Sequence, residues 1–348
     1  MKEKVRSLWK LSFNDSEDFF NLYFDKRYKD DITMVIQEGE DVVASLQMIP
    51  YPMTFLNDVI PTSYISGACT HPSHRNKGIM KELLHNTLKK KYTDNVLVST
   101  LIPAEKWLFD YYRKFDYTAV FDYSTESFDI SLPISSGEVT VEESDGSKEV
   151  YEYFNKKMMK RPCCIQHTFE DFETILADLS LGDGKLFIAK KASEITGIAF
   201  CIKENSSIII KELFAEDTDV RNILLKEIAS KMNCDHIICI VPPIPNTEKQ
   251  LGMVRIINAE KMLQLFAAKH KDLSCEIKIT DNILKENEGY YHLSNGTCER
   301  IVTLKEEFYY DITIYQLGNI LFGKTDDSLP EIFRSVENHK PYMSLMLD

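Results

Sequence analysis

Apolar residues recur along this chain with two spacings, one typical of helices and the other of strands. Residues 3–13 and 16–29 carry apolar side chains at helical spacing, and Asn14, Asp15 and Ser16 between them are common N-cap residues. Beyond these helices the pattern predicts, in order, strands at 32–37, 41–48, 52–56 and 64–70, a helix that begins at Gly78, a strand at 95–101, a helix at 104–115 and an extended segment at 117–128. Helices and strands mixed within one segment indicate an α+β domain.

The pattern restarts near residue 133 and changes character near residue 249. The second segment is predicted to contain strands at 139–141, 186–190, 195–202, 208–214 and 237–241, and helices at 148–159, 167–178 and 219–232. The third is predicted to contain an apolar stretch at 253–258, helices at 259–269, 312–321 and 329–337, and strands at 273–280, 289–294 and 299–303, with an Asn295-Gly296 hairpin turn. We therefore divide the chain into residues 1–132, 133–248 and 249–348.

The composition is that of a globular protein. With 348 residues, of which 44% are hydrophobic and 27% charged, the chain is long enough for two or three domains. No apolar run approaches the ~20 residues that would span a bilayer, and the charged N-terminal stretch lacks the apolar core of a signal peptide. We expect a cytoplasmic protein with no membrane partner.

Charge and cysteine usage narrow the classes of partner. The net charge of −13 argues against nucleic acid and mildly favours cationic small molecules. The eight cysteines show no Cys-x-x-Cys spacing and most lie in apolar runs, so buried free thiols are expected. The histidines show no ligand spacing either, and no metal site is predicted.

One turn carries most of the candidate chemistry. The strand predicted at 64–70 passes through a basic stretch into the helix at Gly78, so Arg75 and Gly78 form an Arg-x-x-Gly pattern at the helix start. The first N–H groups of a helix have no partner within it and lie at the positive end of its dipole, which suits a pyrophosphate. Gly78 lets a phosphate approach the backbone because glycine has no Cβ. An ordinary strand–helix turn with solvated charges is the alternative.

Two motifs in the first segment resemble the GNAT (Gcn5-related N-acetyltransferase) family. Its phosphate motif, Gln/Arg-x-x-Gly-x-Gly/Ala, matches Arg75-x-x-Gly78-x-Met80 except at the last position. Its aromatic-Tyr-x-x-x-Gly-Phe motif compares with residues 111–117, where Asp116 replaces the glycine at a position that tolerates a left-handed backbone. No clear first strand precedes the first predicted helix.

The second segment repeats this order of strands and helices but lacks the Arg-x-x-Gly turn. Ala215, Glu216 and Asp217 precede its last helix, and the two carboxylates would repel an anion. We interpret the segment as a second, degenerate GNAT-like domain that has lost its cofactor. The third segment resembles the sterol-carrier-protein-like α/β module.

Over its whole length the chain resembles the enhanced intracellular survival (Eis) acetyltransferases. Local matches are Pro-x-His-Arg-x-x-Gly at 72–78, Phe13-x-Asp15, and Arg-Ile-x-Asn at 255–258. The resemblance implies an α+β fold of tandem GNAT-like mixed sheets flanked by helices, followed by a sterol-carrier-protein-like domain. It also implies an acyltransferase with acetyl-CoA as co-substrate and assembly into a homo-oligomer.

The resemblance further implies which residues bind the cofactor. One set would hold the pyrophosphate, mainly through backbone N–H groups, and a second set at the splayed end of a strand would pair with the pantetheine arm and polarise the thioester carbonyl. The first set is Arg75, Asn76, Lys77, Gly78 and Met80, and the second is Ala68 and Thr70. The alternative for Ala68 and Thr70 is a purely structural place in the strand.

Tyr112 stands where the family keeps its general acid, and a phenol with an ordinary pKa near ~10 suits a departing thiolate. A core aromatic is the alternative, because Leu108, Tyr112 and Phe115 share a helical face.

For the base, the resemblance points to the α-carboxylate of Asp348, carried by the apolar tail at 342–347. With a pKa of ~3.5 it would orient the cation and relay a proton through water. The alternative is a tail that packs on its own domain.

Phe13 and Asp15 match acceptor positions of the family, where aromatic and acidic groups suit a cationic amine. Asp15 as the N-cap of the following helix is the alternative. We therefore expect an acetyl-CoA-dependent N-acetyltransferase that acetylates a primary, cationic amine, polyamine- or aminoglycoside-like, in a ternary complex. Two other classes stay open: a lipid-binding carrier that uses the third segment, and an inactive acyl-CoA-binding regulator.

Overall fold

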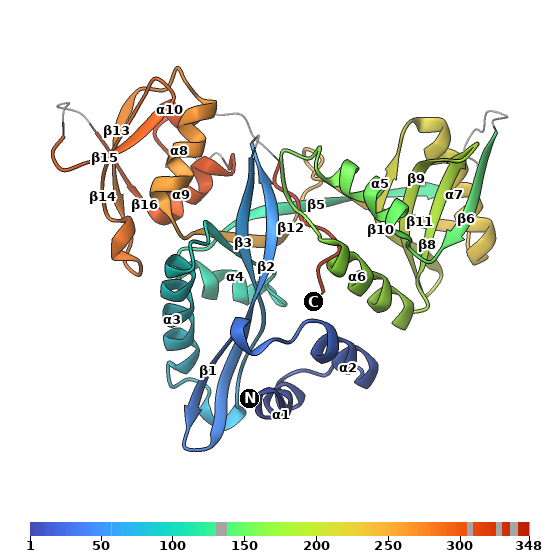
Figure 1. Ribbon diagram of the computed structural model, residues 1–348, viewed down its shortest axis with the longest axis horizontal. Coiled ribbons are helices and arrows are strands. Elements are labelled where there is room, and N and C mark those ends of the chain that lie inside the picture. The colour runs from blue at the N-terminus through green and yellow to red at the C-terminus, as the bar shows by residue number, and fades with distance from the viewer. Residues whose placement is uncertain (57, 130–137, 305–308, 325–328, 335–339, 348) are drawn as a thin grey trace.

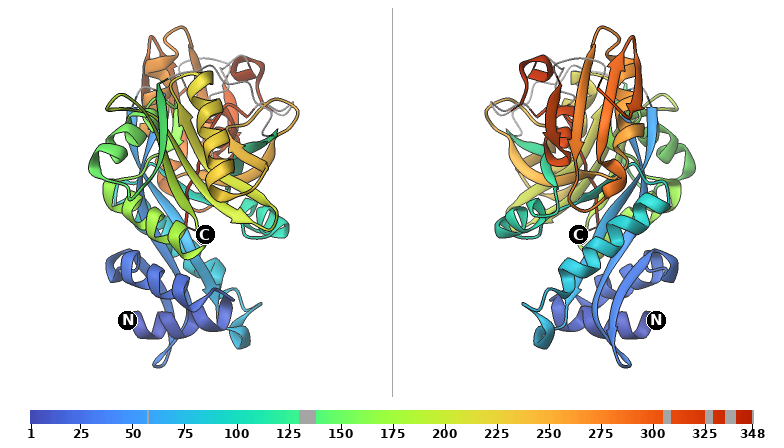
Figure 2. Two further views of the ribbon diagram at one scale, coloured as in Figure 1. Left: turned by 90° about the vertical axis from the view of Figure 1, so that its right-hand side faces the viewer. Right: turned by 90° about the vertical axis from the view of Figure 1, so that its left-hand side faces the viewer.

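The computed structural model describes residues 1–56, 58–129, 138–304, 309–324, 329–334 and 340–347. Within these ranges the strands form one sheet of twelve strands and one of four. Figure 1 shows three lobes, with the N-terminal helices at the bottom, the second segment at the upper right and the third at the upper left. Strands of the long sheet run through the centre and connect the first segment with the second, whereas the third lobe contains the four-stranded sheet. Figure 2 shows the molecule from its two sides.

The first segment contains the predicted helices and strands, with one difference. The strands predicted at 41–48 and 52–56 form a single continuous strand, β2. The elements are α1 (Lys2–Ser12), α2 (Glu17–Lys26), β1 (Thr33–Glu38), β2 (Asp41–Phe55), β3 (Asp58–Thr70), α3 (Ile79–Thr93), β4 (Val98–Leu101), α4 (Lys106–Arg113) and β5 (Thr118–Asp129), with short 3-10 turns at Asp30–Ile32 and Pro72–His74.

The second segment also follows the predicted order, with one additional strand, β7. This strand is three residues long, too short for a periodic signal, and it pairs with the far end of β2, where Cys164 faces Thr54. The first two segments are therefore joined by strand pairing. The elements are β6 (Val139–Ser144), α5 (Lys148–Met158), β7 (Cys163–Ile165), α6 (Phe169–Leu181), β8 (Lys185–Lys191), β9 (Glu194–Glu204), β10 (Ser207–Ala215), α7 (Thr218–Met232) and β11 (His236–Val241).

The first strand after residue 248 belongs to the long sheet. The order is β1-β2-β3-β4-β12-β5-β11-β10-β9-β8-β6, so β12 (Lys249–Ile256) lies between β4 and β5 of the first segment. β5 is shared: its first half pairs with β12 and its second half with β11, both antiparallel. A strand assigned by sequence to the third segment thus completes the sheet of the first, because strand pairing is decided by edges that meet in space.

The third segment forms the smaller sheet, in the order β15-β14-β13-β16. Asn295 and Gly296 both have positive φ, as the predicted hairpin turn requires. The helix predicted at 312–321 begins only after Thr313, whose side chain forms a capping box with Gln316. The elements are α8 (Ala259–Lys269), β13 (Cys275–Thr280), β14 (Gly289–Ser294), β15 (Thr297–Ile301), β16 (Tyr310–Thr313), α9 (Ile314–Leu321) and α10 (Glu331–Arg334), with a 3-10 turn at Lys285–Asn287.

A fully buried arginine connects the first and third segments. Arg255, at the end of β12, donates to the carbonyl of Phe115 at 2.8 Å and to Asp281 Oδ1 at 2.7 Å. Asn258 of the same motif accepts from the Lys261 N–H and caps α8. A buried guanidinium is tolerated only when paired and hydrogen-bonded, so these contacts hold the turn after α4 against the third segment.

The tail at 340–347 leaves the third segment and packs elsewhere. Tyr342 forms an isolated parallel bridge with Cys164 of β7, and Leu345 packs in the apolar cluster formed by α5, α6, β8 and β9. Figure 1 shows the red tail running beside α6. The alternative in which the tail packs on its own domain is therefore wrong for these residues. Asp348 lies outside the described residues.

All eight cysteines lie in the described ranges, where each is buried and none forms a disulfide bond, as expected. None of the helices in the described part of the chain combines the length and the apolar character that crossing a bilayer demands.

Candidate functional site

A cavity of about 440 to 620 Å³ opens at each of two places where a pair of parallel strands separates. In the first segment, β3 pairs with β4 only from Thr62 to Tyr64, and from there to Thr70 it pairs with β2 on its other side only. The larger cavity, about 620 Å³, lies at this opening. It is lined by Ser12, Phe13, Ala68, Cys69, Thr70, His74, Arg75, Asn76, Gly78, Ile79, Met80, Lys81, Glu105, Trp107, Leu108, Tyr111 and Tyr112.

The wall of the cavity contains most of the predicted site residues. The members of the two predicted cofactor sets that line it are Ala68, Thr70, Arg75, Asn76, Gly78 and Met80, and the predicted catalytic and acceptor residues that line it are Tyr112 and Phe13. Lys77 is exposed on the turn and Asp15 is exposed at the start of α2, both outside this wall. The tertiary structure therefore brings together residues from α1, β3, the turn, α3 and α4.

The turn before α3 has the geometry of an anion cradle. Gly78 is the N-cap residue of α3 at φ +82°, and no side chain of the described residues caps the helix. A Cβ at Gly78 would meet nothing within 4 Å in the described part of the chain, so the approach to the first N–H groups is open. Asn76 also has positive φ, and Arg75 is tethered by its Nε to the carbonyl of Thr70 at 3.2 Å. Free N–H groups beside a guanidinium fit a diphosphate.

A bulge in β3 shapes the strand edge at the cavity. Between the pairs Gln47–Ser66 and Ser45–Cys69, β3 contains one residue more than β2, and Gly67 within this bulge has φ +59°. A Cβ there would lie 2.0 Å from Cζ3 of Trp9, so only glycine fits. We did not predict this role for Gly67. A glycine inside an apolar strand pattern is the signal that could have revealed it.

Asp15 supports this bulge indirectly. Its Oδ2 accepts from Trp9 Nε1 at 2.7 Å, and the Trp9 ring covers Gly67. Ser16, and not Asp15, caps α2, because its side chain accepts from the Phe19 N–H. The alternative of Asp15 as the N-cap is therefore wrong, and its role as an acceptor ligand stays a prediction.

Tyr112 lies at the junction of cavity and core. It comes from α4, is 8% exposed, and contacts the rings of Tyr111 and Tyr117 at centroid distances of 5.4 and 5.9 Å. Burial, and secondarily these two phenols, raises the pKa of Tyr112 above its ordinary value. The side chain is thus both a core aromatic and a cavity residue, and its phenol stays protonated at neutral pH.

Several further wall residues were not predicted. Trp107 is 60% exposed, and its Nε1 donates to Glu105 Oε2 at 2.6 Å, so an indole and a carboxylate border the cavity at the start of α4. Lys81, in the first turn of α3, adds a cation near the cradle. An exposed tryptophan at a helix start, and a lysine three positions after Gly78, are the signals in the sequence.

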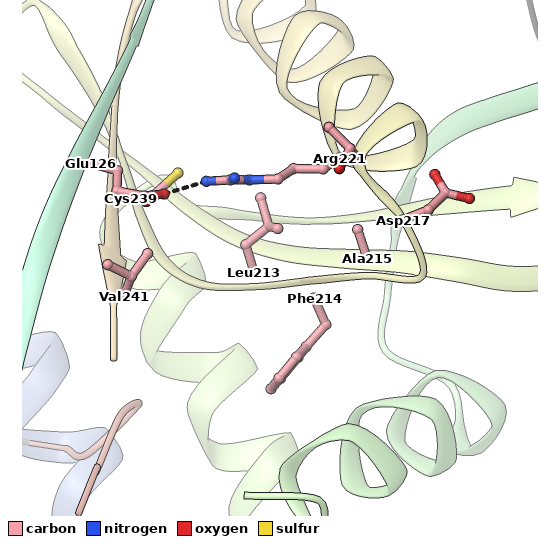
Figure 3. A pocket seen from close by; sticks show the side chains of 9 residues that line it. Glu126, Leu213, Phe214, Ala215, Asp217, Arg221, Cys239 and Val241 are labelled. Carbon is pink, nitrogen blue, oxygen red and sulfur yellow. Dashed lines mark hydrogen bonds and ion pairs between the residues drawn. The ribbon is translucent and has the colours of Figure 1, made fainter. Parts of the chain in front are cut away.

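The smaller cavity, about 440 Å³, lies at the corresponding opening between β10 and β11 (Figure 3). Here Asp217 caps α7 by accepting from the Val220 N–H at 2.8 Å. Arg221 extends across the opening and pairs with Glu126 of β5, as the dashed line in Figure 3 shows. A carboxylate occupies the helix start, so the arrangement disfavours a bound diphosphate.

Comparison with known proteins identifies the class of protein to which the first segment is similar. Residues 2–120, about a third of the chain, match a protein-family model described as an acetyltransferase (GNAT) domain. A search of curated proteins finds no match. The first segment is therefore an acyltransferase domain of the GNAT class, a class that binds acetyl-CoA.

Solved structures share the architecture of the whole chain. A GCN5-related N-acetyltransferase from Kribbella flavida superposes with a TM-score of 0.77 at 15% identity, covering 99% of this chain and 95% of that one. One from Anabaena variabilis gives 0.75 at 17% identity, covering 98% and 95%. Eis1 from Mycobacterium abscessus gives 0.74 at 13% identity, covering 98% and 96%. At these identities the likeness establishes the fold, a mixed α+β GNAT-like architecture with sheets flanked by helices.

Proposed function

We propose that this chain is an acetyl-CoA-dependent N-acetyltransferase that transfers the acetyl group directly to a primary, cationic amine within a ternary complex. The observation that carries the proposal is the uncapped start of α3 at Gly78, which borders the same cavity as the buried phenol of Tyr112. An anion cradle and a protonated acid in one cavity are what transfer from a thioester to an amine demands.

The residues of the turn would bind the diphosphate of the cofactor. Backbone N–H groups at the start of α3 would donate to its oxygens, and Arg75, Lys77 and Lys81 would supply positive charge. The backbone of Ala68 and Thr70 would pair with the pantetheine arm, because β3 has no β4 partner beyond Tyr64. Acetyl-CoA, when bound, supplies an activated thioester to this cavity.

Tyr112 would donate the proton that the departing thiolate takes up. Its raised pKa keeps the phenol protonated across neutral pH, and general acid catalysis of this kind contributes about 100-fold or more. Phe13 and Glu105, an aromatic ring and a carboxylate in the same wall, would favour a cationic acceptor.

The α-carboxylate of Asp348 is proposed as the group that orients the ammonium and relays its proton through water. Its support is the resemblance and the path of the tail, which leaves the third segment and is buried between the first and second. We further propose that the third segment is a sterol-carrier-protein-like domain and that the second segment has lost its cofactor. We also propose that the chain assembles into a homo-oligomer. A lipid carrier is less favoured, because the third segment is filled by buried side chains such as Phe266, Tyr291 and Leu321.

Calorimetric titration with acetyl-CoA, followed by assay of released CoA with a panel of amines, tests the proposal. The panel includes polyamines, aminoglycosides and, as the matched control, their N-acetylated forms. Saturable binding and CoA release with free amines alone are expected. Binding without CoA release from any amine would leave the acyl-CoA-binding regulator, and absence of binding would overturn the assignment of the cavity.

A further inference from the structure

A serine near the end of the tail is held by two side chains of the second segment. Ser344 Oγ donates to Glu212 Oε2 at 2.6 Å, and its carbonyl accepts from His167 Nε2 at 2.9 Å. Ser344 is 7% exposed, Glu212 1% and His167 2%, so both bonds are shielded from water. The second bond requires a proton on Nε2, and burial lowers the pKa of His167, which favours the neutral tautomer with its proton on that atom.

Glu212 is held in place by an arginine. Arg161 binds it through two parallel bonds of 2.7 and 2.8 Å, and the same guanidinium lies over the rings of Phe214 and Tyr342 at 4.6 and 4.7 Å. A carboxylate buried to this degree needs such pairing. The arginine that neutralises Glu212 thus also contacts the tail through Tyr342.

A bulge in β10 turns Glu212 toward the tail. The pairing of β10 with β9 shifts between Ile210 and Glu212, so that Ile210 faces Cys201 whereas Glu212 faces Phe200. Cys201 belongs to the apolar cluster under α7, and Phe200 to the cluster under α5 and α6 where the tail lies. Without the extra residue, Glu212 would share the face of Ile210, because side chains alternate along a strand.

The remaining described part of the tail also has a specific seat. The Tyr342 N–H donates to the carbonyl of Cys163 at 2.9 Å, and the Ile165 N–H donates to that of Tyr342 at 3.3 Å. Met343 packs over β12, where a Cβ at Gly252 would lie 2.8 Å from its Sδ. The tail therefore passes between the sheet of the first segment and the second segment, with its register set by both.

We propose that Glu212 and His167 are positioning residues for the transfer reaction, and that the second segment binds the tail and fixes its position. Through Ser344 they fix the direction in which the chain end leaves the second segment. The inference rests on the proposed function for its catalytic consequence. The second segment would then have a role in the reaction, although its own opening between β10 and β11 is crossed by the Arg221–Glu126 pair.

Ser344→Ala is the decisive variant, because it removes the bond to Glu212 and leaves the Glu212–Arg161 pair intact. Ser124→Ala is the matched control: Ser124 is also buried, and its hydroxyl bonds Thr247 and the Ile244 N–H, away from the tail. Loss of one hydrogen bond to a buried charge is expected to change the measured quantities by about tenfold or more.

Two readouts are measured on the full-length protein. The first is the rate at which carboxypeptidase removes tail residues, followed by mass spectrometry without substrate. The second is kcat for CoA release, alongside the acetyl-CoA Kd. In Ser344→Ala we expect tail removal to accelerate and kcat to fall, each by about tenfold, with the Kd unchanged within about twofold. His167→Gln, whose side-chain amide can still donate, is expected to lose less than His167→Leu.

The outcomes separate the two proposals. If carboxypeptidase removes the tail of Ser344→Ala at the wild-type rate, the proposal that the second segment holds the tail through Ser344 is overturned, whatever the activity. Faster removal with unchanged kcat would overturn the positioning role while leaving the wild-type activity, and therefore the proposed function, in place. A wild-type protein that transfers no acetyl group to any amine would overturn both the proposed function and the positioning role, and the protease rates would still decide whether the second domain holds the tail.

Discussion

The two strand-to-helix turns of this chain share a plan and differ in chemistry. In each, a strand pairs in parallel with its neighbour over three residues and then separates, and a 15-residue helix follows. The first turn ends in Gly78, which leaves the start of α3 uncapped within the described structure, whereas the second ends in Asp217, which caps α7. The same backbone plan therefore offers donors to an anion at one turn and a negative charge at the other.

The contents of the two openings differ in the same direction. The first holds a cavity of about 620 Å³ bordered by Arg75 and Lys81, and the second is crossed by Arg221, whose charge is neutralised by Glu126. An unneutralised cation raises the affinity for a diphosphate, and a paired one contributes little. The comparison teaches that two turns with the same backbone plan can differ in how well they suit a diphosphate, because a few side chains at each turn set its charge.

The largest effect should follow from giving the first turn the character of the second. In Gly78→Asp, a carboxylate would occupy the cradle and an L-residue would be strained at φ +82°. We expect the Kd for acetyl-CoA, measured by calorimetry, to rise about 100-fold or more. Gly39→Asp is the control, since Gly39 also has positive φ and an open surrounding in the described structure but lies at the β1–β2 turn. Equal weakening of acetyl-CoA binding in both variants would refute the proposal that the turn before α3 binds the diphosphate.

Tyr112→Phe should remove the proposed acid and leave binding intact. We expect kcat to fall by about 100-fold with the acetyl-CoA Kd within about twofold. Tyr111→Phe removes a neighbouring phenol of the same cavity and should retain most of the activity. Comparable losses in the two variants would contradict the assignment.

The pH profile gives a second test of Tyr112. Because burial raises its pKa, the protonated acid persists as pH rises and is lost only above the ordinary value of ~10. The rate profile should therefore show no alkaline decline due to this phenol below pH ~10. A declining limb near neutrality that disappears in Tyr112→Phe would contradict the raised pKa.

Arg75→Ala should sharpen the comparison with an effect of intermediate size. Arg75 is exposed, so its attraction to a diphosphate is screened, and we expect the acetyl-CoA Kd to rise by about 5- to 10-fold. The difference from wild type should shrink as salt is added. Arg113→Ala, which removes an exposed arginine of α4 outside the cavity wall, should bind as wild type. A salt-independent loss would indicate a structural role through the Thr70 tether.

The smallest effect is expected at the second turn. Asp217→Asn keeps an N-cap and removes its charge, so the free energy of unfolding should change by less than about 0.5 kcal/mol. The stoichiometry of acetyl-CoA should stay at one per chain, because the Arg221–Glu126 pair still crosses the opening. A second bound equivalent would show that Asp217 alone had closed this site.

Much of the candidate site could be predicted because its signals are local. The Arg-x-x-Gly turn, the helix after it and Tyr112 lie within one stretch of chain, and Asp116 adopts the left-handed φ of +61° that its motif position requires. The acids at 216 and 217 correctly marked a turn unlike the first. Asp15 and Gly67 could not be assigned in this way, because their roles depend on where the Trp9 ring lies.

The sequence by itself determined the order of most helices and strands, the burial of the cysteines and the chemistry of each turn, because periodicity, caps and backbone conformation act over a few residues. Only the tertiary structure decided that β12 would enter the sheet of the first segment, that β7 would pair with β2 and that Ser344 would meet Glu212. Those contacts join residues far apart in the chain. Which strand edge or buried charge a segment meets depends on how whole elements pack, and no local pattern records that choice.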